Sequence, residues 1–229
     1  MLKLATPLAC VLSMFVLFGC EEKEDDQIFS AQQCLDAAAI NGSPVDNCVA
    51  MINGITTPKS YVIRCSADFM RQGIDNDAIV SAIEDLDKND NTVDPTVTLY
   101  DTFAFDDAGS ETAEELVETA VTNCTATGSK TLTVLALSAK TATTIKSLAG
   151  GNIAAWIDGV DVDNLANTNP DELENIGESV VAMHPIACGV GGQFEGTEVC
   201  VNLASAIASG TDTATIGQQF LTDLKDPGN

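Results

Sequence analysis

Four oxygen-bearing side chains alternate along one acidic stretch of the chain and could bind a hard cation. They are Asp85, Asp87, Asn89 and Asn91. Calcium takes about six to eight oxygen ligands, and alternate positions of a tight loop after a helix can supply several of them. A full calcium loop also needs a central glycine and a final acid, where this chain has Asp90 and Thr96. We therefore favour a solvated acidic turn, with a calcium-dependent binding module as the alternative.

Six of the eight cysteines are available for structural use, because Cys10 and Cys20 belong to the N-terminal segment considered below. The six are Cys34, Cys48, Cys65, Cys124, Cys188 and Cys200. An even number of cysteines in an exported chain indicates disulfides. Zinc is the competing interpretation, but the chain has no C-x-x-C spacing and a single histidine.

The cysteine spacing favours one local bridge and leaves another choice open. Cys188 and Cys200 flank a glycine-rich loop and are expected to pair with each other. Cys48 can reach either Cys34 or Cys65 across the turn between two predicted helices, so both pairings are possible.

The chain offers few residues for catalysis. His184 is its only histidine, and Pro185 follows it at the expected end of a helix, which favours a capping or packing role. No G-x-S-x-G or H-E-x-x-H sequence occurs, and no cysteine has an obvious partner that would stabilise a thiolate. The glycine-rich run 189–192 lacks the Lys-Ser/Thr of a phosphate-binding loop. A non-enzymatic function is therefore expected, with a hydrolase as the least favoured alternative.

The N-terminus has the layout of an export signal. Lys3 precedes an apolar run over residues 4–18, which is too short for a membrane span and is followed at once by acids. The run ends in Leu17-Phe18-Gly19-Cys20, which resembles the lipobox of bacterial lipoproteins. The resemblance implies cleavage before Cys20 and attachment of acyl chains such as palmitate to that cysteine. An ordinary secretory signal is the alternative, but no other small-x-small site lies nearby.

A lipid on Cys20 would fix where the protein works. Each buried methylene contributes about 0.8 kcal/mol, so two or three acyl chains hold a protein on a membrane essentially permanently. Glu21 stands where an aspartate would resemble an inner-membrane retention signal, so we expect the outer membrane, on its periplasmic or its surface side. Residues 20–29 are acidic and polar, and they are expected to form a tether at most about 30 Å long at roughly 3.3 Å per residue.

The charge of the chain excludes one large class of partner. Lys and Arg number 10 against 34 acids, for a net charge of −24, and removal of residues 1–19 takes away Lys3 and no acid. Nucleic-acid-binding proteins need basic side chains to displace counterions, so nucleic acid is excluded as a partner. Solubility explains the acidity better than a specific cationic partner does. A second acidic cluster, Asp158, Asp161 and Asp163, is then a product of chance.

Apolar residues recur at helical spacing along most of the chain. Helices are predicted at about 30–40, 45–55, 59–72, 76–87, 112–124, 129–148, through 156, 169–184, 197–209 and 213–224. A capping box formed by Thr112 and Glu115 and the cap sequence Asn169-Pro170 mark two of the starts.

The region 89–110 breaks this pattern. It is rich in Asp, Asn and Thr, and its apolar residues share one parity, as in a strand: Val97, Leu99, Phe103 and Phe105. Because a lone strand is not stable without a partner, an extended connection with its aromatic side chains packed on the helices is expected.

Residues 30–88 contain an internal repeat. A shift of 31 residues pairs Cys34 with Cys65 and Gly42 with Gly73. The other aligned pairs are Asp46 with Asp77, Val49 with Val80, Ile52 with Ile83 and Ile55 with Leu86. In length and hairpin layout the two units resemble tetratricopeptide-like solenoids, although they lack the Trp, Leu, Gly and Tyr signature. The resemblance implies stacked helix hairpins.

The predicted protein is all-α, with solenoid-like stacked helix hairpins and disulfide staples. Residues 1–19 form a lipoprotein signal peptide, 20–29 a lipidated tether and 30–229 the helical domain. Within that domain, 30–88 are the hairpin repeats, 89–110 the connection and 111–229 the C-terminal helices. The expected function is that of a membrane-anchored envelope lipoprotein that binds another envelope protein or a peptide without catalysis. The lipid is its only expected cofactor, unless calcium binds.

Overall fold

The fold is all-α, as predicted. The computed structural model describes residues 8–41, 44–75, 77–81, 95–190, 192, 195–196 and 198–226. Within these residues the single β-type pairing is an isolated bridge between Ala108 and Glu111. Stacked helix hairpins and disulfide staples make up the architecture.

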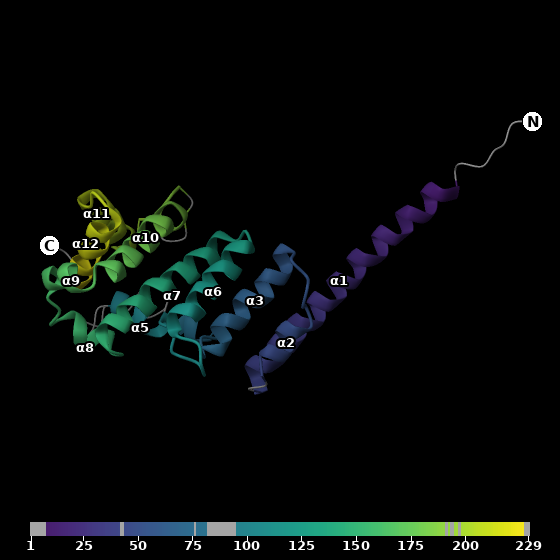
Figure 1. Ribbon diagram of the computed structural model, residues 1–229, viewed down its shortest axis with the longest axis horizontal. Helices are drawn as coiled ribbons and strands as arrows, with labels where there is room; N and C mark the ends of the chain where they lie inside the picture. The colour runs from purple at the N-terminus through teal and green to yellow at the C-terminus, as the bar shows by residue number, and fades with distance from the viewer. Residues whose placement is uncertain are drawn as a thin grey trace, which may run out of the picture.

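The long helices lie side by side in a row (Figure 1). Their bounds are α1 Leu8–Asn41, α2 Asp46–Ala50, α3 Pro58–Arg71, α5 Pro95–Phe103, α6 Ala113–Ala126, α7 Lys130–Ala149, α8 Ile153–Ile157, α9 Val162–Thr168, α10 Pro170–Ala187, α11 Glu198–Ser209 and α12 Thr213–Lys225. Neighbours pack in the order α1, α3, α6, α7, α10, α12 and α11. The shorter helices α5, α8 and α9 pack on α7, α10 and α12.

Two ion pairs fix the direction of α3 relative to α1. Lys59, at the start of α3, pairs with Asp25 in α1 at 2.9 Å. Arg71, at the end of α3, pairs with Asp46 just beyond the end of α1 at 2.8 Å. The two helices therefore run in the same direction. We call the end of the row where α3 begins the near end, and the end where α3 stops the far end.

The loop before α6 lies at the far end. Gln72, just beyond α3, accepts a hydrogen bond from the backbone N–H of Asp106 at 2.8 Å. From there α6 returns toward the near end, and α7 runs back beside it after the turn at 127–129. Lys146, in the last turn of α7, pairs with Asp106 at 2.7 Å, which confirms that α7 stops at the far end.

The core consists of two apolar clusters that share α3. The smaller cluster joins α1, α2 and α3 and contains Ile28, Ala31, Leu35, Ala38, Cys48, Ile52, Ile55, Ile63 and Ala67. The larger cluster begins with Cys65 and Phe69 of α3 and continues through the helices from α5 to α12. Opposite faces of α3 are therefore buried in different clusters, and α3 connects the α1–α2 unit to the rest of the molecule.

Three disulfides link neighbouring helices. Cys188 pairs with Cys200, as predicted, and joins α10 to α11. Cys48 pairs with Cys34 and joins α2 to α1, which decides between its two possible partners. Cys65 pairs with Cys124 and joins α3 to α6. Cys34 and Cys65 are equivalent in the 31-residue repeat, yet one bridges within its own hairpin and the other bridges outward.

The disulfides indicate an extracytoplasmic compartment, because the cytosol keeps thiols reduced. No helix among the described residues combines the length and the apolar composition needed to cross a bilayer.

The connection at 89–110 is not extended throughout, because α5 occupies Pro95–Phe103. Proline is tolerated in the first turn of a helix, where its missing N–H has no intrahelical partner. The apolar residues of this short segment fit both the alternation of a strand and the spacing of a helix. Tyr100 decides between the two. It is 2% exposed, at the opposite parity to Val97 and Leu99, as a helical face requires.

Helix α10 continues past the predicted stop at His184-Pro185. It ends at Ala187, with Pro185 inside its last turn. Ala187 is fully buried in the larger cluster, and the Cys188 N–H donates to the His184 carbonyl at 2.9 Å. Burial of this turn offsets the hydrogen bond that the proline cannot make. At the other end, the Asn169 side chain does not cap the helix and instead accepts a hydrogen bond from Thr168 Oγ1.

The predicted tether at 20–29 lies within α1, which is continuous from Leu8 to Asn41. Ile28, which falls inside the predicted tether, is buried in the smaller cluster. One predicted helix is clearly shorter than expected: α2 covers only Asp46–Ala50 of the predicted 45–55. Of the predicted helix at 76–87, residues 77–81 are helical, and the remainder lies outside the described residues.

Candidate functional site

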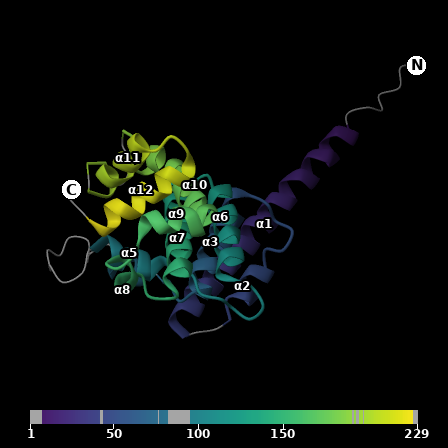
Figure 2. The ribbon, with the colours of Figure 1, turned by 60° about the vertical axis from the view of Figure 1, so that its left-hand side comes forward.

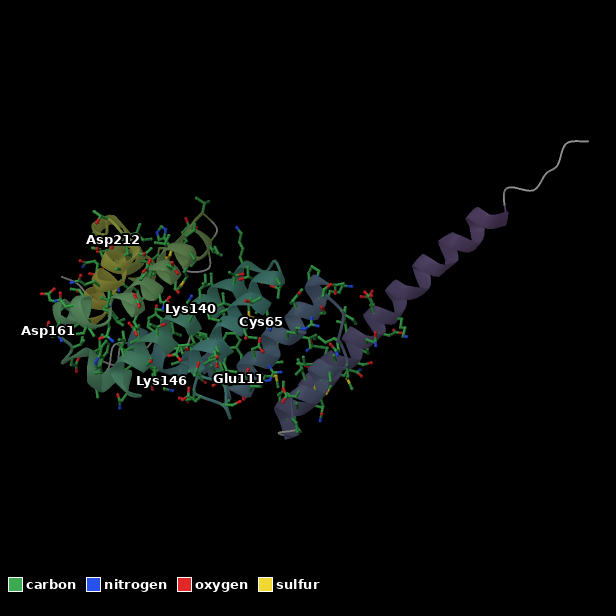
Figure 3. All side chains as sticks on the ribbon, in the orientation of Figure 1. Cys65, Glu111, Lys140, Lys146, Asp161 and Asp212 are labelled. Atoms are coloured by element: carbon green, nitrogen blue, oxygen red, sulfur yellow. A yellow bond between two sulfur atoms is a disulfide. The ribbon has the colours of Figure 1, made fainter. Side chains whose placement is uncertain are left out.

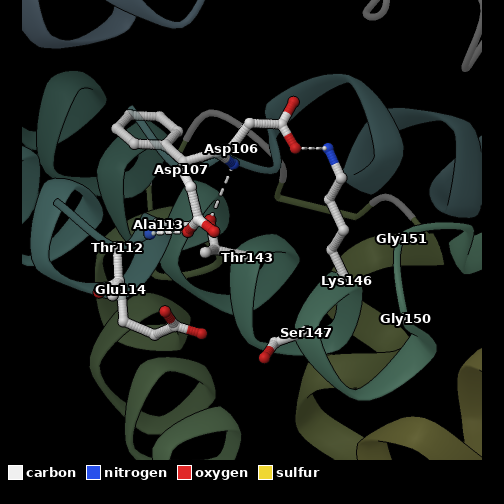
Figure 4. Close-up of a pocket in the computed structure, with 11 residues that line it drawn as sticks. Asp106, Asp107, Thr112, Ala113, Glu114, Thr143, Lys146, Ser147, Gly150 and Gly151 are labelled. Atoms are coloured by element: carbon white, nitrogen blue, oxygen red, sulfur yellow. Dashed lines mark hydrogen bonds and ion pairs between the residues drawn. The ribbon is translucent and has the colours of Figure 1, made fainter. Parts of the chain in front are cut away.

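A shallow pocket lies at the far end of the row, between the start of α6 and the end of α7 (Figure 4). Its volume is about 320 Å³. Three segments line it: 105–107 before α6, 112–114 at the start of α6, and parts of 143–151 at the end of α7. Figure 3 shows Lys146 and Glu111 toward this end, below Lys140 in the middle of the row.

Local sequence rules explain both walls of the pocket. Thr112 Oγ1 accepts from the Glu115 N–H at 3.3 Å, and the Glu115 carboxylate accepts from the Thr112 N–H at 3.0 Å, which is the predicted capping box. On the other wall, Gly150 ends α7 in the left-handed conformation with φ of 64°. Glycine adopts this backbone conformation without the steric cost of a Cβ.

Most polar groups around the pocket already hold the backbone in place. Asp107 Oδ1 accepts from the Ala113 N–H at 2.8 Å. Thr143, buried below the opening, accepts from the Phe105 N–H at 2.9 Å. The ammonium of Lys146 is paired with Asp106 (Figure 4). These groups are structural, and they keep the opening in one shape.

Glu114 and Ser147 reach into the opening from α6 and α7 (Figure 4). With Asp106 and Asp107, Glu114 brings the carboxylates that line the pocket to three, against one ammonium, that of Lys146, which is already paired with Asp106. The lining residues, all of which are described, include no histidine or cysteine that could activate the Ser147 hydroxyl. The pocket can therefore bind a small positively charged group more readily than it can perform nucleophilic catalysis.

The chain matches no protein-family model, no curated protein and no solved structure. No relative therefore assigns a role to any of these residues.

The predicted calcium ligands lie outside the described residues. They are Asp85, Asp87, Asn89 and Asn91. Within the part of the chain that the structure describes, no three His, Cys, Asp or Glu side chains are grouped so that they could hold a metal ion. Asp161, from the second acidic cluster, has a structural role instead: its carboxylate caps α9 by accepting from the Asn164 N–H at 3.0 Å.

The remaining sequence candidates do not converge on one place. His184 is half-buried on α10 and is not among the residues that line the pocket between α6 and α7. Trp156 lies on α8 and packs on the larger apolar cluster. Cys20 belongs to α1, and the structure does not describe its side chain.

A buried carboxylate that the sequence did not reveal lies between α3 and α6. Asp68 is 7% exposed, and its two oxygens accept from Arg71 Nη1 at 2.6 Å and from Asn123 Nδ2 at 2.8 Å. Burial raises the pKa of this carboxyl above its usual value, and the contacts with Asn123 and Arg71 only partly oppose the rise. The signal in the sequence was an acid between Ala67 and Phe69 on a helix whose opposite faces are both apolar.

Asp68→Asn should change the pH dependence of stability in one direction. The folded pKa lies above the unfolded value near 3.8, so the folded state keeps a proton that the unfolded state has released. The wild type should therefore lose unfolding free energy relative to the variant as pH rises from 3.8 through the folded pKa. Urea unfolding of both proteins between about pH 2.5 and pH 7 measures the difference.

Asp212→Asn is the matched control, with the opposite sign. Asp212 caps α12, and the hydrogen bond from the Thr215 N–H lowers its pKa. The wild type should lose stability relative to this variant as pH falls through the lowered pKa. A flat or rising difference between wild type and Asp68→Asn across the same pH range contradicts the assignment of Asp68.

Proposed function

We propose that this protein is a bacterial envelope lipoprotein, anchored by lipid on Cys20, that binds another envelope protein or a peptide without catalysis. The anchor rests on the Leu17-Phe18-Gly19-Cys20 sequence after a short apolar run. Three disulfides in the folded body are consistent with export to the compartment that such an anchor requires. Glu21 after the cysteine favours the outer membrane.

The observation that carries the interaction role is the pocket at the far end of the row. Its polar groups are mostly used to hold a fixed shape, and that shape is open to solvent. A preformed surface loses little conformational entropy when a partner binds. The three carboxylates around it favour a partner segment that carries Lys or Arg, and the net charge of the chain attracts such segments over a longer range.

Cys20→Ala should move the protein from the membrane fraction to the soluble fraction while leaving its helices intact. The alanine cannot accept acyl chains, so the apolar surface that holds the protein on the membrane is lost. Fractionation of cells that express each form measures where the protein is located. Labelling with radioactive palmitate measures acylation, and circular dichroism measures helix content. A variant that stays in the membrane fraction, or a wild type that takes up no label, would contradict the anchor.

The interaction role can be tested in the same cells. A photo-cross-linking residue at Ser147 should give a discrete adduct, since this position faces into the opening. The same residue at Thr125, which is exposed on α6 outside the pocket lining, is the control and should give none. Adducts of equal intensity at both positions, or none at Ser147, would argue against the far-end pocket as the binding surface.

A further inference from the structure

Helix α1 does not stop where the folded body begins. It is one continuous helix from Leu8 to Asn41, and its N-terminal part stands clear of the other helices (Figures 1 and 2). Cys20 lies within it, eight residues before Ile28, which is the first residue buried in the smaller cluster. No irregular segment separates the proposed lipid-bearing residue from the core.

We propose that, after cleavage before Cys20, the remainder of α1 is a rigid stalk that holds the domain upright on the membrane. This inference rests on the lipid attachment proposed above. A helix rises about 1.5 Å per residue, so the stalk from Cys20 to Ile28 is about 12 Å long. A flexible tether over 20–29 would instead allow any separation up to about 30 Å.

The stalk is fixed to the body at its base. Asp25 pairs with Lys59 at the start of α3, one turn before the buried Ile28. Ala31 and Leu35 continue the buried stripe at helical spacing, and Cys34 is covalently joined to Cys48. The direction of α1 is therefore set by packing on two other helices, and a pivot at Ile28 would break these contacts.

Cleavage also creates a helix start with favourable charges. Glu21, Glu22 and Glu24 then fall in the first turns of the shortened helix, where the macrodipole is positive. Acids at this end stabilise a helix by roughly 0.3–1 kcal/mol each when exposed. Before cleavage the same acids lie in the middle of α1, where the dipole gives no such stabilisation.

The direction of the stalk determines which end of the row faces away from the bilayer. Asp25 and Lys59 lie at the near end, so Cys20 projects beyond that end. From Cys20 to Asn41, at the far end, the helix spans about 32 Å at 1.5 Å per residue. The pocket between α6 and α7 would therefore face the aqueous space, where a soluble partner can reach it.

Hydrogen exchange on the mature, lipidated protein tests the stalk directly. On neutral phosphatidylcholine vesicles, the backbone amides of residues 24–28 should exchange at least about tenfold more slowly than in an unstructured peptide. Exchange at unstructured rates in the vesicle-bound protein would overturn the stalk and leave the anchor standing. Failure of the protein to bind vesicles at all would overturn both.

A second measurement uses the single tryptophan of the chain. Trp156 lies on α8, shortly after the end of α7, so an upright domain holds it away from the bilayer. Energy transfer from Trp156 to dansyl-labelled lipid headgroups should be weak in the wild type and in Asp26→Ala. Asp26→Pro breaks the helix at an exposed position and should increase the transfer at least about twofold. Equal transfer in all three proteins would show that the domain moves freely about its anchor.

Discussion

Gly177→Ala should lower the free energy of unfolding by about 2 kcal/mol or more. Helices α10 and α12 cross with their backbones in direct contact at this point. A Cβ at Gly177 would lie 1.8 Å from the Thr213 carbonyl oxygen, and a Cβ at Gly217 would lie 2.0 Å from that of Leu173. Backbone atoms cannot rotate away as side chains can, so the helices would have to separate. Alanine recovers only about 1 kcal/mol through its better helix propensity.

Separation of α10 and α12 would affect the whole C-terminal part of the core. Ile176, Val180 and Leu221 are fully buried around the crossing. Interiors are packed as densely as organic crystals, so a gap between two helices forfeits contacts on both sides. Urea unfolding followed by circular dichroism measures the loss of unfolding free energy. The melting temperature should also fall, by roughly 2–4 °C per kcal/mol.

Gly159→Ala is the matched control for this prediction. The nearest atom to a Cβ at Gly159 is the Trp156 carbonyl oxygen at 3.9 Å, an ordinary van der Waals distance. The variant should stay within about 0.5 kcal/mol of the wild type. If Gly177→Ala were as stable as Gly159→Ala, the close approach of α10 and α12 would be wrong.

Removal of the Cys65–Cys124 disulfide should cost more than removal of either other bridge. Its cysteines are 59 residues apart, against 12 for Cys188 and Cys200. Loop-closure entropy gives about 4 kcal/mol for the longer loop and about 3 kcal/mol for the shorter one. Both sulfurs of the longer bridge are also fully buried, so replacement by alanine leaves a cavity between α3 and α6.

The comparison requires the double variants C65A/C124A and C188A/C200A, with unfolding measured for each without reductant. Removal of both cysteines avoids an unpaired thiol that could exchange with the remaining bridges. We expect the lower urea midpoint for C65A/C124A. A lower midpoint for C188A/C200A would mean that the bridge between α3 and α6 does not constrain the unfolded chain as its length implies.

Local signals in the sequence were sufficient to locate most helices. The capping box at Thr112 and Glu115 places the start of α6, and Gly150 places the end of α7. The Cys188–Cys200 bridge followed from cysteines that are close in sequence. In each case the residues that determine the structure lie within a few turns of one another, so spacing alone carries the information.

Features that depend on distant segments could not be read in this way. Cys65 pairs across 59 residues, and its choice of partner depends on how α6 packs on α3. Asp68 is buried for the same reason, because its partner Asn123 arrives with α6. The site at the far end has the same origin, since Asp106 and Lys146 meet only after α7 has returned beside α6. No periodicity or motif within one segment predicts such contacts between distant segments.

The shared position of α3 has a mechanical consequence. If the proposed partner pulls on the far end while the proposed lipid holds Cys20, the tension passes from α1 through α3 to the rest of the protein. The Cys34–Cys48 bridge prevents force from extending the chain between those two residues. The Cys65–Cys124 bridge does the same for the chain between its own cysteines, which are 59 residues apart. Two of the three cross-links thus lie in series along the path that bears the load, and an oxidised domain can transmit force that a reduced one would dissipate by unravelling.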